Sequence, residues 1–182
     1  MNRRTFRLVP FEASMAASGL RLDGHIAREG SALAIRYELS GPLETLLIPA
    51  GAPSPRRRDE LWKHTCLECF LAAPGKARYW EVNLSPSGDW NLYGLSGYRS
   101  GLTPVHSIEA LPITVEREER RLALEVRLDL AWISSPLEPL EVAICAVLEQ
   151  RDGRLSHWAL VHGGSGPDFH RRESFLIHLD SR

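Results

Sequence analysis

Apolar and polar residues alternate along much of the chain. Segments 31–39 and 121–128 both place apolar side chains at every second position. A period of two is typical of β-strands with one buried face, because successive side chains point to opposite faces. Segment 141–148 is apolar almost throughout, so it predicts a central strand covered on both faces.

The rest of the chain predicts more short strands, and only one helical turn, at 129–133. Turn signals such as Pro74-Gly75 and Asp152-Gly153 separate them. The other strand candidates are 5–9, 20–28, 61–71, 79–84, 89–95, 112–118, 155–161 and 174–179. Many short strands without alternating helices predict an all-β antiparallel β-sandwich of jelly-roll or immunoglobulin-like type. With 182 residues, the chain suits a single domain over residues 1–182.

The segments 61–71 and 79–90 form the predicted hairpin that is most informative about function. On its first strand, Leu67, Cys69 and Leu71 share one face, and Glu68 points to the other. On its second strand, Glu81 and Asn83 lie on the face opposite to the apolar one. Pairing around Pro74-Gly75 brings either Glu81 or Asn83 opposite Glu68, and the sequence leaves both registers open.

Two carboxylates and an amide on one sheet face are costly unless something relieves the repulsion. Like charges directly opposed cost about 0.2–1 kcal/mol. A polar ligand such as a sugar would relieve it through its hydroxyl groups, and so would a cation. The alternatives are that the face is solvated, or that Glu68 and Glu81 pair with Arg78 or Arg99.

Composition and charge exclude several classes of function. A formal net charge of −1 offers no electrostatic footprint for nucleic acid or an anionic membrane. The basic run Arg56-Arg57-Arg58 is interpreted as a solvated loop. No stretch approaches the roughly 20 apolar residues of a membrane span, and no signal peptide is visible after Met1. We therefore expect a cytoplasmic location, no membrane partner and no nucleic-acid partner.

Cysteine and histidine patterns do not predict a metal site. The chain has three cysteines, which argues against a disulfide framework. Cys66 and Cys69 match C-x-x-C, but on a strand their sulfurs point to opposite faces, and no second pair completes a zinc site. His162, Asp168 and His170 flank a glycine-rich loop and could line a rim or bind a metal. The run 163–166 lacks the ending of a phosphate loop.

Two aromatic residues are candidates for stacking on a sugar. Trp62 lies just before Glu68, and Phe169 lies in the last long loop. Sugar C–H faces pack on aromatic rings while carboxylates and amides accept from hydroxyls. The sequence leaves open whether Trp62 stacks on a ligand or lies in the core, and it places Trp80 in the core. Glycoside hydrolysis by Glu68 and Glu81 is an alternative, but nothing in the sequence supplies the separate pKa environments it needs.

These residues carry a family resemblance. The segments 61–62, 65–70 and 79–90, with 97–99, 156–160 and 167–170 after them, resemble the DOMON-like group of the family 9 carbohydrate-binding module, in its small bacterial members. The resemblance spans residues 20–180 and implies a β-sandwich with a ligand site on one sheet. By motif position, Trp62 would supply one stacking ring and Glu68 a hydroxyl acceptor. Glu81 and Asn83 would be the polar pair of the next strand.

The resemblance also bears on the second ring and on cofactors. A tryptophan is expected near the last loop, where this chain offers Phe169 and His170. Some relatives carry structural calcium, for which no ligands are assigned here. Other DOMON proteins bind haem through Met and His, but Met1 and Met15 both lie near the N-terminus. We therefore predict a non-catalytic module without a cofactor that binds a carbohydrate-like small molecule. A glycosidase-like hydrolase and a haem- or metal-binding domain are the alternatives.

Overall fold

Short strands make up the structure, as the alternation predicts. The computed structural model describes residues 2–133 and 138–180, in which there are twelve strands. They are β1 (Asn2–Pro10), β2 (Arg21–Glu29), β3 (Ala32–Ser40), β4 (Cys66–Ala72), β5 (Tyr79–Leu84), β6 (Trp90–Leu95), β7 (Thr103–Pro104), β8 (Ile113–Glu118), β9 (Arg121–Asp129), β10 (Leu140–Glu149), β11 (Leu155–Ala159) and β12 (Ile177–Leu179). Within this described part, the helical segments are short 3₁₀ turns, and no helix is long and apolar enough to cross a membrane.

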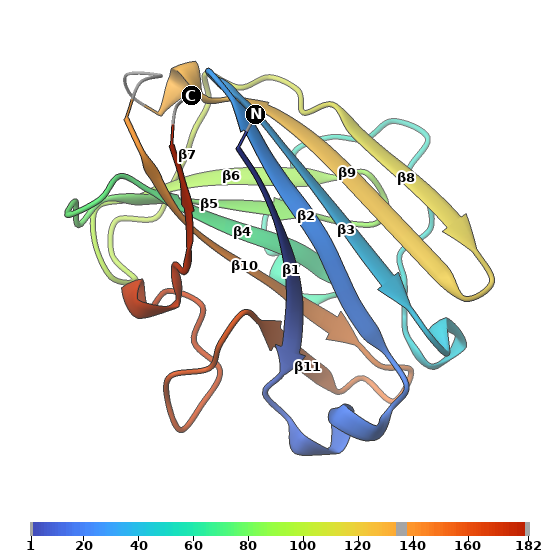
Figure 1. Cartoon of the computed structure of the whole chain (residues 1–182). Helices are drawn as coiled ribbons and strands as arrows, with labels where there is room; N and C mark the ends of the chain where they lie inside the picture. Colours follow the sequence, from blue (N-terminus) through green and yellow to red (C-terminus); the bar gives the residue numbers. More distant parts are fainter. Residues whose placement is uncertain (1, 134–137, 181–182) are drawn as a thin grey trace.

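The strands form two antiparallel groups that face each other across the core (Figure 1). The first sheet has the order β8-β9-β3-β2-β1, and the second has the order β11-β10-β4-β5-β6-β7, with β12 also paired to β10. Strand β1 connects them, since most of it pairs with β2 while its last residues, Val9 and Pro10, pair with Ala159 and Trp158 of β11. The two layers are therefore joined along one edge by a shared strand.

The core between the sheets consists of the alternating apolar residues of both. Leu22, Ile26, Ile35, Leu71 and Val82 are all fully buried there. Every second residue of each strand points inward, so this layer follows directly from the sequence pattern.

The side chain of Tyr37 forms a hydrogen bond between the two sheets. The Tyr37 hydroxyl of β3 donates to the backbone carbonyl of Glu68 on β4 at 2.8 Å. Trp80 also lies in the core, as predicted, and its ring packs edge-on against Trp132.

A second apolar layer covers the outer face of the second sheet. Phe70, Tyr79, Tyr93 and Cys145 point outward from their strands, and Phe175 packs on them from the C-terminal segment. Every residue of β4, β5 and β6 is consequently buried. The prediction of a central strand covered on both faces is confirmed for β10, whose residues from Val142 to Leu148 are all buried.

The predicted strands differ from the observed ones mainly at their ends. Residues 61–63 form a 3₁₀ turn, and the strand predicted over 61–71 begins only at Cys66. The strand predicted over 174–179 contracts to 177–179, because a 3₁₀ turn occupies 172–174. Besides the predicted turn at 130–132, further 3₁₀ turns occur at 13–17 and 43–45. The two residues of β7 are too few for any alternation to show.

The basic run at 56–58 is only partly the solvated loop that we predicted. Arg57 is half-buried, and its guanidinium lies over the Trp90 ring, 4.3 Å from the centroid. It donates to Asn91 Oδ1 at 2.6 Å and to three backbone carbonyls. A run of three arginines does not show in the sequence which side chain is buried. That depends on the contacts of the segment with β6, where Arg57 pairs with Trp90.

Candidate functional site

The hairpin of β4 and β5 takes one of the two predicted registers. Glu68 lies opposite Asn83, and Phe70 lies opposite Glu81. All three polar residues point to the outer face of the second sheet, as the alternation predicts. That face is not solvated: the exposed fraction is 2% for Glu68, 5% for Glu81 and 0% for Asn83. The interpretation of this face as a solvated one is therefore wrong.

A pocket of about 290 Å³ opens on this outer face. Five of the six predicted ligand-binding residues line it, namely Trp62, Glu68, Glu81, Phe169 and His170. The sixth, Asn83, does not reach the pocket surface, but its Nδ2 donates to Glu81 Oε1 at 2.7 Å. The structure thus brings together side chains from two strands, a 3₁₀ turn and the last long loop.

The two carboxyl groups lack a cationic partner. Within residues 2–133 and 138–180 no basic nitrogen lies within 4.0 Å of either Glu68 or Glu81. Arg78 lies over the Trp80 ring, and Arg99 pairs with Asp168 at 2.9 Å. The alternative that Arg78 or Arg99 forms an ion pair with these glutamates is therefore wrong.

Burial is the largest cause of the pKa shifts of Glu68 and Glu81. It raises the pKa of Glu68 well above the ordinary value, and the charge of Glu81 adds to that rise. Burial also raises the pKa of Glu81, but the hydrogen bond from Asn83 and the charge of Arg99 oppose the rise. The two environments differ, so Glu81 keeps a negative charge more readily than Glu68.

Among the residues that the structure describes, two buried acceptor atoms have no hydrogen-bond partner, Glu68 Oε1 and Asn83 Oδ1. They belong to residues that face each other across the strand pair. A proton on Glu68 or a donor group of a bound molecule could each satisfy such an acceptor. The other oxygen, Glu68 Oε2, lies 3.9 Å from the Cys145 thiol, and burial raises the pKa of that thiol well above its usual range, which keeps it a neutral donor.

The aromatic candidates lie at the pocket and are partly exposed. Trp62 packs edge-on against Tyr93, with ring centroids 5.8 Å apart, and still lines the pocket. It therefore belongs to the outer apolar layer and not to the core between the sheets. Phe169 lies against the His157 ring at 6.0 Å. Both rings keep part of their surface available to a ligand.

Asp168 joins two loops at the rim of the pocket. Its carboxylate accepts from the Tyr98 hydroxyl at 2.5 Å, from Arg99 Nη2 at 2.9 Å and from the backbone N–H of His170 at 3.1 Å. Arg99 has a left-handed backbone with φ 49°, which is uncommon for a residue other than glycine. These contacts fix the segment after β6 against the segment before β12.

The histidines that line the pocket are only partly those that the sequence predicts. His162 does not join Asp168 and His170, because its Nε2 contacts the Val9 carbonyl at 2.9 Å. His157 was not predicted as a site residue, yet it lines the pocket, with its ring held by Glu12 at 2.8 Å. Its hydrogen-bond partner Glu12 comes from the far end of the chain, so no local signal could have identified this position.

Metal-ligating residues do not converge in the described part of the chain, where no three His, Cys, Asp or Glu side chains could hold an ion together. Cys66 points to the outer face, and Cys69 points into the core, so the prediction that their sulfurs diverge is confirmed.

Comparison with known proteins finds similar structures but no similar sequence. No protein-family model matches the chain, and no curated protein matches it either. A protein of Bacteroides uniformis ATCC 8492, provisionally described as carbohydrate-binding, superposes with a TM-score of 0.65 at 12% identity, over 94% of this chain and 83% of that one. The likeness confirms the predicted antiparallel β-sandwich.

Two further structures are of a family 9 carbohydrate-binding module from Caldicellulosiruptor kristjanssonii. Their TM-scores are 0.47 for the complex with glucose and 0.46 for the complex with cellotriose, both at 12% identity. They cover 78% of this chain and 66% and 65% of their own chains.

Proposed function

We propose that this protein is a non-catalytic module that binds a carbohydrate-like small molecule in the pocket on its second sheet. The observation that carries the proposal is the composition of the pocket. Buried carboxyl groups with an unpaired oxygen form its floor, and partly exposed aromatic rings flank them. Sugars combine hydroxyl groups that seek acceptors with C–H faces that pack on rings.

The size of the pocket and its unpaired polar atoms support a small, polar ligand. Its volume of about 290 Å³ lies at the lower end of the range of about 300–1,000 Å³ that is usual for small-molecule sites. Buried polar atoms without partners are rare in folded proteins, because each costs about 1–3 kcal/mol. A hydroxyl group that reached Glu68 Oε1 would remove that cost, which favours a hydroxylated ligand over an apolar one.

The related fold adds independent support. The Bacteroides uniformis protein with the same fold carries a provisional description as carbohydrate-binding. That description belongs to another protein, and for this chain it is a reason to test sugars first. A cytoplasmic location remains part of the proposal, as does the absence of a metal or haem cofactor.

A panel of neutral monosaccharides and disaccharides, measured by titration calorimetry, tests the proposal. We expect at least one to bind, and we expect Trp62→Ala and Glu68→Ala to abolish its binding while the thermal unfolding transition persists. Phe11→Ala is the matched control for Trp62→Ala, since Phe11 is a partly buried ring that packs against His162 outside the pocket. If no sugar binds, or if both site variants bind as well as the wild type, the proposal fails.

Glycoside hydrolysis stays as a second candidate because of one observation. The pocket holds two carboxyl groups whose pKa values are affected differently, with Glu81 alone receiving a hydrogen bond from Asn83 and the field of Arg99. Such a difference is what separates a proton donor from a base. A bell-shaped pH–rate profile on aryl glycosides that disappears in Glu81→Gln would support turnover. No release of the aryl group across the panel would leave binding as the function.

A further inference from the structure

A chain of hydrogen bonds runs from the backbone of the 96–101 segment to the wall of the pocket. The backbone N–H of Arg99 donates to the Tyr79 hydroxyl at 3.1 Å. The same hydroxyl lies 2.8 Å from His170 Nδ1. His170 lines the pocket next to Phe70, whose ring contacts it edge-on at 5.0 Å.

The hydrogen bond from Arg99 to Tyr79 determines the direction of the one between Tyr79 and His170. A backbone amide only donates, so the Tyr79 oxygen accepts from Arg99 and keeps its own proton to give. Tyr79 is fully buried, and in the described part of the chain its hydroxyl contacts no acceptor other than His170 Nδ1. If Nδ1 carried a proton, the tyrosine proton would be buried without an acceptor, which costs about 1–3 kcal/mol.

We propose that Tyr79 fixes His170 as the tautomer protonated on Nε2, and that this N–H is the hydrogen-bond donor of the pocket wall. Nε2 lies across the ring from Nδ1 and therefore away from Tyr79. It has no hydrogen-bond partner among residues 2–133 and 138–180. A donor on a pocket-lining side chain, without a partner in the protein, is available to a ligand.

Titration of the two rings agrees with this arrangement. Burial, with the nearby charge of Arg99, lowers the pKa of His170 to about 4, so the imidazole is neutral at physiological pH. Burial raises the pKa of Tyr79, so its hydroxyl stays protonated. A neutral imidazole has one donor and one acceptor nitrogen, and Tyr79 uses the acceptor.

The pocket then presents different chemistry on two sides, which narrows the ligand class. Its floor carries Glu81, the more readily ionised of the two carboxyl groups, which accepts, and its wall carries the His170 N–H, which only donates. Arg99 also lines the pocket, but its guanidinium is paired with Asp168. A hydroxyl group can do both, whereas an ammonium group cannot satisfy His170 and a carboxylate or phosphate would be repelled by Glu81. This extension rests on the proposed function, and it selects neutral polyhydroxylated ligands over amino sugars and uronic acids.

The tautomer can be measured without any ligand. Long-range proton–nitrogen NMR correlations of protein labelled with ¹⁵N-histidine at pH 7 distinguish the protonated from the unprotonated ring nitrogen. We expect Nε2–H for His170 in the wild type and a mixture of both tautomers in Tyr79→Phe. Tyr93→Phe is the matched control, because Tyr93 donates to Asp59 and does not contact His170. Nδ1–H or a charged ring in the wild type would overturn the assignment, whether or not a sugar binds.

The ligand class is tested by calorimetry with glucose, galactose and mannose, each beside its 2-amino and uronic acid counterparts. We expect the neutral sugars to bind more tightly than both charged forms, and His170→Phe to weaken the best neutral binder about tenfold. His178→Phe, on the exposed side of β12, should leave binding unchanged. Equal affinity in His170→Phe, or preference for a charged form, overturns the role of the donor. Complete absence of binding instead overturns the proposed function and leaves the tautomer to be judged by NMR.

Discussion

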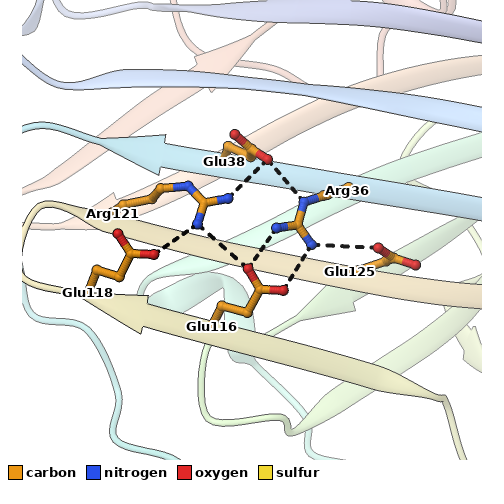
Figure 2. A network of polar contacts seen from close by, with 6 residues as sticks. All are labelled: Arg36, Glu38, Glu116, Glu118, Arg121 and Glu125. Carbon is orange, nitrogen blue, oxygen red and sulfur yellow. Dashed lines mark hydrogen bonds and ion pairs between the residues drawn. The ribbon is translucent and has the colours of Figure 1, made fainter.

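The outer faces of both sheets carry glutamates, but those on β3, β8 and β9 of the first sheet are paired with arginines, whereas Glu68 and Glu81 of the second sheet are buried. On the first sheet, the side chains of β3, β8 and β9 form a network of ion pairs between two arginines and four glutamates (Figure 2). Arg36 alone contacts Glu38 at 3.0 Å, Glu116 at 2.8 Å and Glu125 at 3.6 Å. On the second sheet, Glu68 and Glu81 lie under loops without a cation in contact.

The difference appears in the direction of the pKa shifts. Hydrogen bonds from Arg36 lower the pKa of Glu38 and of Glu116, whereas burial raises the pKa of Glu68 and of Glu81. Alternation places all four carboxylates on outward faces, so it cannot distinguish them. What separates them is whether loops cover the face, and covered carboxylates without partners are what a ligand site requires.

The largest expected effect concerns the pH dependence of stability. The pKa of Glu68 is raised by folding, so the folded state binds more protons than the unfolded state between the ordinary glutamate pKa of about 4.3 and the raised one. Stability therefore falls as the pH rises through that window, by up to about 1.4 kcal/mol per pH unit. Glu68→Gln, which resembles the protonated acid, should reduce this slope to the part that the raised pKa of Glu81 contributes, and it should exceed the wild type in stability at pH 8.

Urea unfolding followed by tryptophan fluorescence from pH 5 to pH 8 measures the slope. Glu116→Gln is the matched control on the first sheet, where the lowered pKa of Glu116 makes its contribution present above the ordinary pKa and lost as the pH falls. It should leave the slope between pH 5 and pH 8 unchanged. A wild-type slope that persists in Glu68→Gln would show that Glu68 is not the buried acid responsible.

The next effect concerns affinity and again separates the two faces. Glu81→Gln removes the charge that a ligand hydroxyl would contact, while the side-chain oxygen can still accept from Asn83 Nδ2. A hydrogen bond to a charged group contributes about 1.5–3 kcal/mol, so the affinity for the bound sugar should fall roughly ten- to a hundredfold. Calorimetry measures this, with Glu125→Gln on the first sheet expected to bind as the wild type does. Equal losses in both variants would contradict a role specific to the pocket.

The sequence predicts most of the fold because that fold depends on alternation. Strands β3, β9 and β10 follow from the spacing of their apolar residues, and so does the common face of Glu68, Glu81 and Asn83. The register between β4 and β5 stayed open, since the turn at Pro74-Gly75 permits both pairings and both bury the same faces.

The pocket could not be predicted in the same way. It depends on contacts between residues distant in sequence, such as Tyr98 with Asp168 and His157 with Glu12. Loop residues carry no periodic signal, so whether a loop covers a sheet face is decided by a few side chains. Phe169 and His170 were predicted as site residues from their residue types near the last loop and from the resemblance to a family, and their roles remain predictions.

A smaller effect tests the connection between the two faces. Strand β3 carries Arg36 and Glu38 outward, and between them Tyr37 points inward and donates to the Glu68 carbonyl at 2.8 Å. Tyr37→Phe keeps the ring and removes one buried hydrogen bond, so the free energy of unfolding should fall by about 0.5–1.5 kcal/mol. Urea denaturation measures this fall. If the affinity for the sugar falls as well, the hydroxyl also positions Glu68; if it stays constant, β4 holds Glu68 without this contact.

The smallest effect is expected on the first sheet, where charges are paired but exposed. Exposed ion pairs contribute about 0.2–1 kcal/mol each, because solvent screens them and ordering long side chains costs entropy. Arg36 is only 17% exposed and contacts three carboxylates, so Arg36→Met should lower the free energy of unfolding by about 1 kcal/mol at low salt. Methionine keeps the apolar stem, so the loss measures charge and not packing.

Salt and pH separate that loss from a change in the core. Because screening weakens exposed pairs, the difference between Arg36→Met and the wild type should shrink in 1 M NaCl. It should also shrink as the pH falls through the lowered pKa values of Glu38 and Glu116, where protonation removes the partners of Arg36. Arg7→Met, which removes one exposed pair with Asp23, serves as the control and should have no measurable effect. If the loss of unfolding free energy in Arg36→Met is independent of both salt and pH, the network stabilises the sheet by packing. The contrast with the buried glutamates of the second sheet would then concern burial alone.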